Sequence, residues 1–211
     1  MSSPDDNQAH AARYWPWVLL RALPAVVVAV VITFNADHSA RLGFFTFGAL
    51  ALVGGAVVLV SAVRALHPGV VRWCFAVQGA IGIVLGVIAL FSSAAGLPFL
   101  IFLVSAFGVL TGFLELYSGL RSRGRNDSAR DWLFAGGLTV LFAVVVLVVP
   151  SDYSQPFTGP DGVERALTAS IVLVGLLGAY AAILGVYLVI AGLSLKWAPR
   201  AVAATAAESG S

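Results

Sequence analysis

Charge is scarce in this sequence of 211 residues. Only 10% of its residues are charged, 60% are hydrophobic, and the mean hydropathy is +0.96. A soluble domain typically carries about 25% charged residues, so the composition excludes a water-soluble fold. Basic and acidic residues nearly balance at 12 and 10, and a net charge of +2 gives no basis for nucleic-acid binding. The composition therefore predicts an integral membrane protein whose first partner is the lipid bilayer.

Reactive and metal-binding residues are also few. The single cysteine, Cys74, excludes an internal disulfide, and we expect it to be a small buried apolar residue. His10, His38 and His67 are isolated, and none has a second ligand at metal-binding spacing. The sequence contains no phosphate-binding P-loop, no nucleophile elbow and no dinucleotide fingerprint. We therefore expect no metal, no cofactor and no enzymatic activity.

Long apolar runs, in contrast, are abundant. Each is long enough to cross a hydrocarbon core of about 30 Å as a helix, whereas strands of a membrane barrel would alternate apolar and polar residues. The sequence predicts an all-α bundle of six transmembrane helices in one domain, 15–196, between a polar tail, 1–14, and a disordered tail, 197–211. The six expected helices are 15–34, 42–63, 70–91, 97–120, 132–149 and 167–195.

The positive charges are distributed unevenly along the chain. Ten of the 12 lysines and arginines lie at or near one side of the expected bundle, and the opposite loops hold only Arg41 and Arg165. The positive-inside rule then places both termini and the loops 64–72 and 121–131 in the cytoplasm. All five tryptophans are expected at that same boundary, where an indole keeps its N–H hydrated.

One helical hairpin is repeated three times, over about 15–72, 73–131 and 132–196. The second helices of the three copies align without gaps, and a tryptophan stands near the start of each copy. Because every copy begins on the same side, the repeats are parallel and their pseudo-symmetry axis runs along the membrane normal. Small residues four apart allow helices to approach closely in lipid. The expected packing positions are Ala51 and Gly55, Gly82 and Gly86, Gly108 and Gly112, and Ala181 and Gly185.

These features are similar to those of the HdeD-like family of short-repeat bacterial membrane proteins. The resemblance rests on the spaced glycines after Trp73, on the LVVP sequence ending at Pro150 and on helix ends such as GFLELYSGLRSR (112–123). The first helix departs from the pattern, because Arg21 and Pro24 stand where glycines would be expected. The named member of the family is associated with acid resistance, so the resemblance implies a role in acid or envelope stress. It implies no catalytic residues.

A few polar residues interrupt the apolar helices. Glu115 belongs to a stripe of small or polar residues at helical spacing, which should face other helices rather than lipid. Arg21 and Gln78 lie at a similar depth from the same side. A charge inside the membrane is costly unless it is paired. We therefore expect a polar layer in which Arg21 pairs with Glu115 and Gln78 bridges them. The alternatives are that Arg21 extends to the head groups, or that Glu115 is a protonated structural donor or a functional proton site.

The loop 150–166 is the longest of the expected outer loops. Asp161, with Glu164 three residues later, resembles a helix N-cap, which predicts that the last helix begins above the membrane. The loop is either an ordinary connection or a docking site for a partner in the cell envelope.

Three functions remain open from the sequence. The leading hypothesis is a non-enzymatic inner-membrane protein that contributes to envelope or acid-stress tolerance. The alternatives are an accessory subunit of a larger membrane transport or assembly complex, and a conduit for protons or small solutes. A homo-oligomer and a larger complex are both compatible with the sequence.

Overall fold

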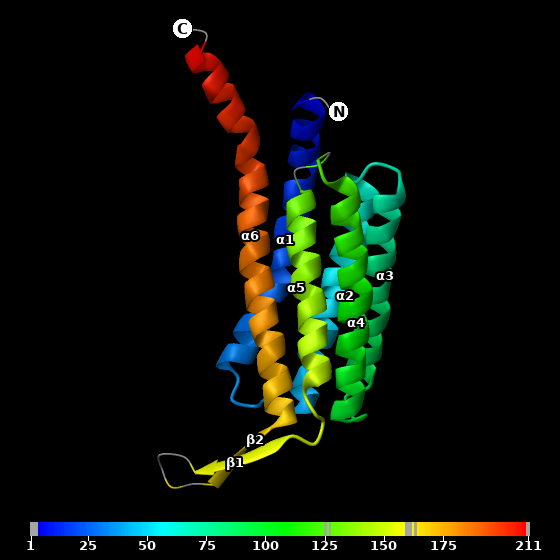
Figure 1. Cartoon of the computed structure of the whole chain (residues 1–211), viewed down its shortest axis with the longest axis vertical. Helices are drawn as coiled ribbons and strands as arrows, with labels where there is room; N and C mark the ends of the chain where they lie inside the picture. The colour runs from blue at the N-terminus through cyan, green and yellow to red at the C-terminus, as the bar shows by residue number, and fades with distance from the viewer. Residues whose placement is uncertain (1–3, 125, 127, 159–161, 163, 210–211) are drawn as a thin grey trace.

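The computed structural model describes residues 4–124, 126, 128–158, 162 and 164–209 (Figure 1). Within this part of the chain, six helices are long and apolar enough to cross a membrane. Their number matches the prediction, and most of their bounds fall within two or three residues of the predicted ones. The helices are α1 (Pro4–Phe34), α2 (Ala40–Ala65), α3 (Val70–Phe91), α4 (Leu97–Ser122), α5 (Ala129–Val148) and α6 (Ala169–Ser209).

The two terminal helices are longer than the sequence predicts. α1 begins at Pro4 instead of residue 15, and α6 continues to Ser209 through the segment expected to be disordered. Proline is well suited to the first turn of a helix. The last segment, AVAATAAE (201–208), is rich in alanine, the strongest helix former. Helix α6 thus extends over the segment expected to be disordered, in keeping with the helix propensity of its alanines.

A β-hairpin replaces the predicted start of the last helix. Strands β1 (Ser154–Thr158) and β2 (Glu164–Thr168) pair antiparallel, with Phe157 opposite Arg165. The expected cap at Asp161 lies outside the described residues, and Glu164 lies in β2, so the helix predicted above the membrane is wrong. Cross-strand backbone pairing outweighs the local capping pattern here, and α6 begins only at Ala169, whose N–H donates to the Tyr153 carbonyl at 2.9 Å.

The closest helix pairs are α2 with α3, α4 with α5, and α6 with α1. Each of these pairs joins the second helix of one repeat to the first helix of the next, and the α6–α1 pair closes the ring. Glycines make the close approach possible: a Cβ added at Gly86 would lie 2.5 Å from the Leu52 nitrogen, and one at Gly79 would lie 2.6 Å from the Leu59 nitrogen. The tight interfaces therefore lie between the sequence repeats rather than within them.

The predicted packing residues occupy these interfaces. Gly55, Gly82 and Gly86 meet across α2 and α3 next to Ala51; Gly108 and Gly112 contact α5; Gly185 contacts α1; and Ala181 is fully buried in α6. The repeat also has a constant register, since Gly55 and Gly112 are 57 positions apart, as are Gly79 and Gly136.

The same register corrects the prediction for the first helix. Ala22, Ala25 and Ala29 stand 57 positions before Gly79, Gly82 and Gly86, and all three alanines are buried. Alanine therefore replaces glycine on α1, and Arg21 is the neighbour of a small-residue position rather than its occupant.

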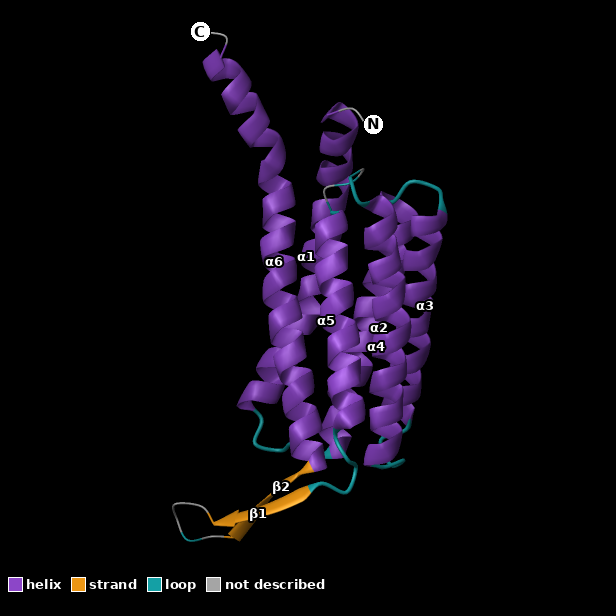
Figure 2. Cartoon of the chain, in the orientation of Figure 1, coloured by secondary structure: helices purple, strands orange, loops and turns teal. Residues whose placement is uncertain are grey.

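The two ends of the bundle differ. The terminal end carries both chain termini and the loops 66–69 and 123–128, and the β-hairpin end carries β1, β2 and the loops 35–39 and 92–96 (Figures 1 and 2). Large apolar side chains that are at most 2% exposed dominate the core near the β-hairpin end: Phe44, Phe47, Leu100, Leu103, Val104, Leu173, Val174 and Leu177.

Candidate intramembrane polar site

Glu115 on α4 is the centre of the polar site. Its side chain is 1% exposed and receives two hydrogen bonds from the Arg21 guanidinium of α1, from Nη1 to Oε1 at 2.5 Å and from Nη2 to Oε2 at 2.7 Å. Gln78 of α3 donates from Nε2 to Glu115 Oε2 at 3.0 Å. A bidentate arginine–carboxylate pair is among the strongest polar contacts in proteins. The contact predicted between Arg21 and Glu115 is therefore present, and Gln78 adds a third bond to the carboxylate instead of standing between the two charges.

The position of Arg21 decides between the alternatives for this residue. Its side chain is only 15% exposed, and its guanidinium is engaged with Glu115, so it does not extend to the head groups. Removing two charges from water costs several kcal/mol per ion, which a well-hydrogen-bonded pair roughly offsets. The pair therefore adds little to the net free energy of unfolding, but removing one of its two residues would strongly destabilise the fold.

The repeat register explains why these residues meet. Arg21, Gln78 and Ala135 occupy equivalent positions on the first helices of the three copies, 57 residues apart. Glu115 follows Gly112 by three residues, as Val58 follows Gly55 and Leu188 follows Gly185. The charged and polar side chains thus occupy positions that face the bundle interior in every repeat, and apolar residues occupy the equivalent positions in the other copies.

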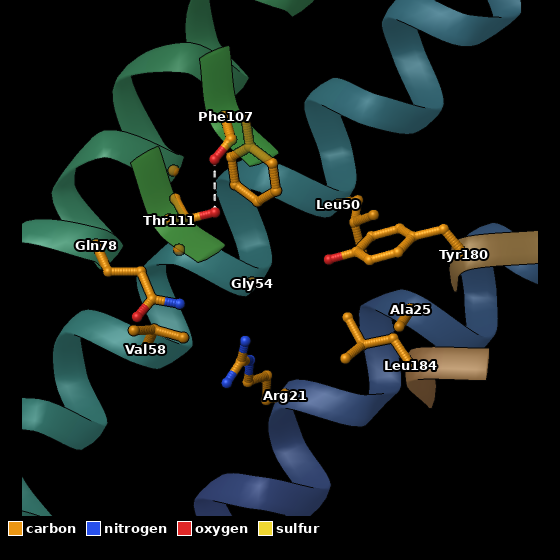
Figure 3. A pocket seen from close by; sticks show the side chains of 12 residues that line it. Arg21, Ala25, Leu50, Gly54, Val58, Gln78, Phe107, Thr111, Tyr180 and Leu184 are labelled. Atoms are coloured by element: carbon orange, nitrogen blue, oxygen red, sulfur yellow. Dashed lines mark hydrogen bonds between the residues drawn. The ribbon is translucent and has the colours of Figure 1, made fainter. Parts of the chain in front are cut away.

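A first cavity of about 40 Å³ is lined by Arg21 of the ion pair and by Gln78. Figure 3 shows the side chains that line it. A water molecule needs about 10–15 Å³ of such volume, so the cavity has room for a few waters. Equivalent residues of all three repeats line it, which places it on the pseudo-threefold axis. These residues are Leu50, Phe107 and Tyr180, and Gly54, Thr111 and Leu184, together with Arg21 and Gln78.

A second cavity of about 20 Å³ also borders the pair. Both Arg21 and Glu115 line it, and so do Tyr14, Asp131 and Trp132, which lie toward the terminal end of their helices. Its wall also contains Val18 and Phe75. Val18, Phe75 and Trp132 follow one another at intervals of 57 positions, so they are equivalent in the three repeats. The ion pair therefore sits on the axis between two small cavities.

Several polar contacts around these cavities could not be predicted from the sequence. Trp132 Nε1 donates to the Tyr14 hydroxyl at 3.0 Å, so this indole is buried and its N–H bonds a protein group instead of water as expected. The hydroxyls of Thr139 and Tyr180 are 2.9 Å apart. The repeat register could have identified Tyr180, because it occupies the position of Leu50 and Phe107, which face the axis.

Asp131 is a further residue that the sequence did not single out. It lies in the first turn of α5, is partly exposed, and accepts a hydrogen bond from the Tyr187 hydroxyl at 2.8 Å. It also lines the second cavity together with Glu115. The terminal half of the axis thus holds two carboxylates that share one cavity.

A known family matches the chain twice. The family described as a short repeat of unknown function (DUF308) matches residues 20–91 and residues 77–148. The two matches begin 57 residues apart, at residues 20 and 77, which is the spacing of the glycines and of the residues around the cavities. No curated protein and no solved structure matches the chain. The matches cover more than half of the chain, which therefore belongs to this short-repeat family, the family of the HdeD-like membrane proteins.

Proposed function

We propose that this protein is a non-enzymatic protein of the bacterial inner membrane that contributes to acid or envelope-stress tolerance, and that Glu115 is the residue through which acidity acts on it. The observation that carries this proposal is the Arg21–Glu115 ion pair at the centre of a six-helix bundle. An ionisable residue inside a membrane span is a functional candidate by default.

The chemistry of the pair links acidity to structure. Protonation of Glu115 would remove the negative partner of a largely buried guanidinium. A buried charge without a partner costs about 3–5 kcal/mol. A bundle that is stable with the ionised pair must therefore rearrange or loosen when Glu115 binds a proton, and that change is the signal we assign to the protein.

The distribution of basic residues supports a cytoplasmic location for the terminal end. Arg64, Arg121 and Lys196 lie near that end, whereas Arg41 and Arg165 lie near the β-hairpin end. By the positive-inside rule, both termini would face the cytoplasm. The β-hairpin would then face the periplasm, and it is the surface where we would expect an envelope partner to bind. Reporter fusions at the C-terminus and within the loop 92–96 should show activity on opposite sides of the membrane.

Survival in acid tests the stress function. A deletion strain should lose viability at low pH, and the wild-type gene should restore it. Glu115→Gln should fail to restore it at equal protein level, while Glu164→Gln, the same change at an exposed site in β2, should restore it fully. Normal survival of the deletion strain, or full rescue by Glu115→Gln, would reject the proposal.

A conduit for protons is the second candidate. The two axial cavities favour it, and their volumes of about 40 and 20 Å³ restrict the cargo to water or protons. For the accessory-subunit hypothesis, a free face of small residues would be the supporting feature. The predicted small residues pack within the bundle, against neighbouring helices of the same chain, and do not form a free face.

A further inference from the structure

We propose that Glu115 exchanges its proton with the terminal end of the bundle only, through one water in the second cavity and the carboxylate of Asp131. This inference extends the proposed function, because it assigns the route by which acidity reaches Glu115. It concerns a proton-binding site with one-sided access, built from residues of α1, α4 and α5.

The second cavity connects the two carboxylates. Glu115 and Asp131 both line it, and its volume of about 20 Å³ accommodates one water. Asp131 is partly exposed near the start of α5, whereas Glu115 is 1% exposed. A water between them would accept a proton from one carboxyl group and donate one to the other, so that Asp131 becomes the entry point.

An unsatisfied acceptor indicates that the site is hydrated. Gln78 is 5% exposed, and its Oε1 has no hydrogen-bond partner among the residues that the structure describes, although its Nε2 is bonded to Glu115. A buried acceptor without a donor costs about 1–3 kcal/mol. Gln78 lines the first cavity, which has room for water. Water donating to Gln78 Oε1 would remove this cost and would hydrate the polar cluster on the side away from Asp131.

The β-hairpin half of the axis offers no comparable route among the described residues. Beyond the ring of Leu50, Phe107 and Tyr180, the buried side chains are mostly apolar, including Phe47 and Leu177 at 1% and 2% exposed. The buried polar side chains there, Thr46 and Ser105, carry hydroxyls and no carboxylate. A proton crossing this apolar layer would have no water molecule to carry it. The access path is therefore one-sided, which suits a sensor better than a conduit.

The proton balance of the step is simple. A proton from water at the terminal end binds the Asp131 carboxylate, passes to the cavity water as that water releases one of its own, and ends on a Glu115 oxygen. Asp131 returns to its ionised form, Glu115 becomes neutral, and the cluster gains one positive charge. The guanidinium of Arg21, which lines the same cavity, can then turn toward the Asp131 carboxylate.

The groups around Glu115 are consistent with this exchange. The titratable side chains on the packed helices are Arg21 and Tyr14 on α1, Asp131 on α5, and Tyr180 on α6. Gln78 on α3 and Ser61 on α2 are polar but do not titrate. Of these groups, only Asp131 is a second carboxylate, so it is the one residue suited to relay a proton in mild acid.

Time-resolved infrared spectroscopy of the purified protein in lipid nanodiscs tests the route. After a drop in pH, a protonated-carboxyl band should appear, and it should be absent in Glu115→Gln. Asp131→Asn should slow the growth of this band by at least about tenfold, the factor expected when a relay bond worth about 1.4 kcal/mol is lost.

A matched pair of variants on α2 tests the path itself. Ser61 lines the second cavity, whereas Gly54, two turns away, lines the first and has no atom within 4 Å of an added Cβ. Ser61→Val should slow the band about as much as Asp131→Asn, and Gly54→Val should leave its rate unchanged. Only variants that elute as folded protein are compared. If either Asp131→Asn or Ser61→Val fails to fold, the other still tests the route.

Each outcome has one meaning. Absence of a Glu115 band over the whole acid range would overturn both this inference and the role of Glu115 in the proposed function. A band whose rate is unaffected by Asp131→Asn and Ser61→Val, or slowed by Gly54→Val instead, would overturn the route alone. If the deletion strain survives acid normally while the Glu115 band grows at the rates expected for each variant, the stress function is overturned and the route stands.

Discussion

The two halves of the bundle axis share the same helices but differ in polarity. Toward the β-hairpin end, the axis is filled mainly by apolar side chains such as Phe47, Leu103 and Leu177. Toward the terminal end, it holds the Arg21–Glu115 pair and the second cavity. The same helices therefore form both halves, and a few polar side chains in one half create the site.

The origin of this difference is visible in the repeats. Arg21, Gln78 and Ala135 occupy one set of equivalent positions, and Val58, Glu115 and Leu188 occupy another. Small residues at the helix contacts are kept in all three copies, mostly glycine and alanine, with Thr139 at the position of Ala25 and Gly82, whereas the axial positions diverge more widely. Repetition thus fixes how the helices pack, and divergence at the axis determines what the interior can do.

Loss of one partner of the ion pair should have the largest effect. Arg21→Ala should lower the free energy of unfolding by about 3–5 kcal/mol, because it leaves Glu115 charged, buried and unpaired. Arg41→Ala is the control at the β-hairpin end, where the exposed guanidinium lies 5.9 Å from the Phe45 ring centre, and it should cost at most about 1 kcal/mol. Unfolding in mixed detergent micelles gives both values.

The reversed pair sharpens this result. Arg21→Glu and Glu115→Arg should each destabilise the protein strongly, and the double variant should recover part of the loss because opposite charges face each other again. A double variant that is no more stable than either single variant would contradict the pairing as the source of the effect.

Close packing of α2 against α3 should be the next most sensitive feature. Gly86→Leu should destabilise by about 1–3 kcal/mol, since a Cβ there would lie 2.5 Å from the backbone nitrogen of Leu52. Gly175→Leu on α6 is the control, because an added Cβ meets nothing within 4 Å. Thermal aggregation monitored by size exclusion should separate the two variants. Equal melting temperatures would contradict the close approach of the two helices.

The hydroxyl of Tyr180 should have the smallest effect. Tyr180 lies in the ring that separates the polar and apolar halves, and its hydroxyl is 2.9 Å from that of Thr139. Tyr180→Phe should cost about 0.5–1.5 kcal/mol, the net value of one hydrogen bond. Tyr153→Phe, whose hydroxyl bonds Gln155 at an exposed site, should be nearly neutral. A larger loss from Tyr153→Phe would show that the β-hairpin stabilises the fold more than the ring does.

Much of the fold follows from the sequence because lipid imposes strong rules. Apolar length predicted the six spans, and small residues four apart identified the interfaces, since helices in lipid associate by close packing. The pair between Arg21 and Glu115 followed from similar depth and opposite charge. Sequence could not assign which helices pair most closely, because that depends on how three repeats close into a ring.

The errors share a physical cause, which is competition between local and longer-range preferences. The cap expected at Asp161 and Glu164 ignored backbone pairing between residues 154–158 and 164–168. Trp132 was expected to keep its indole N–H hydrated because of its residue type, although the repeat register places it with Val18 and Phe75 in the wall of the second cavity. Asp131 was missed because its role depends on a cavity formed by several helices.

Radiolytic footprinting of the intact protein in lipid would test the contrast between the two halves most directly, because hydroxyl radicals formed from bound water oxidise the aromatic rings beside it. Phe75 and Phe47 form a matched pair: both are 1% exposed, but Phe75 lines the cavity next to Glu115, whereas Phe47 packs against Phe107 in the apolar half. We expect oxidation of Phe75 and none of Phe47. Equal oxidation of the two rings, or oxidation of Phe47 alone, would contradict a hydrated terminal half and a dry β-hairpin half.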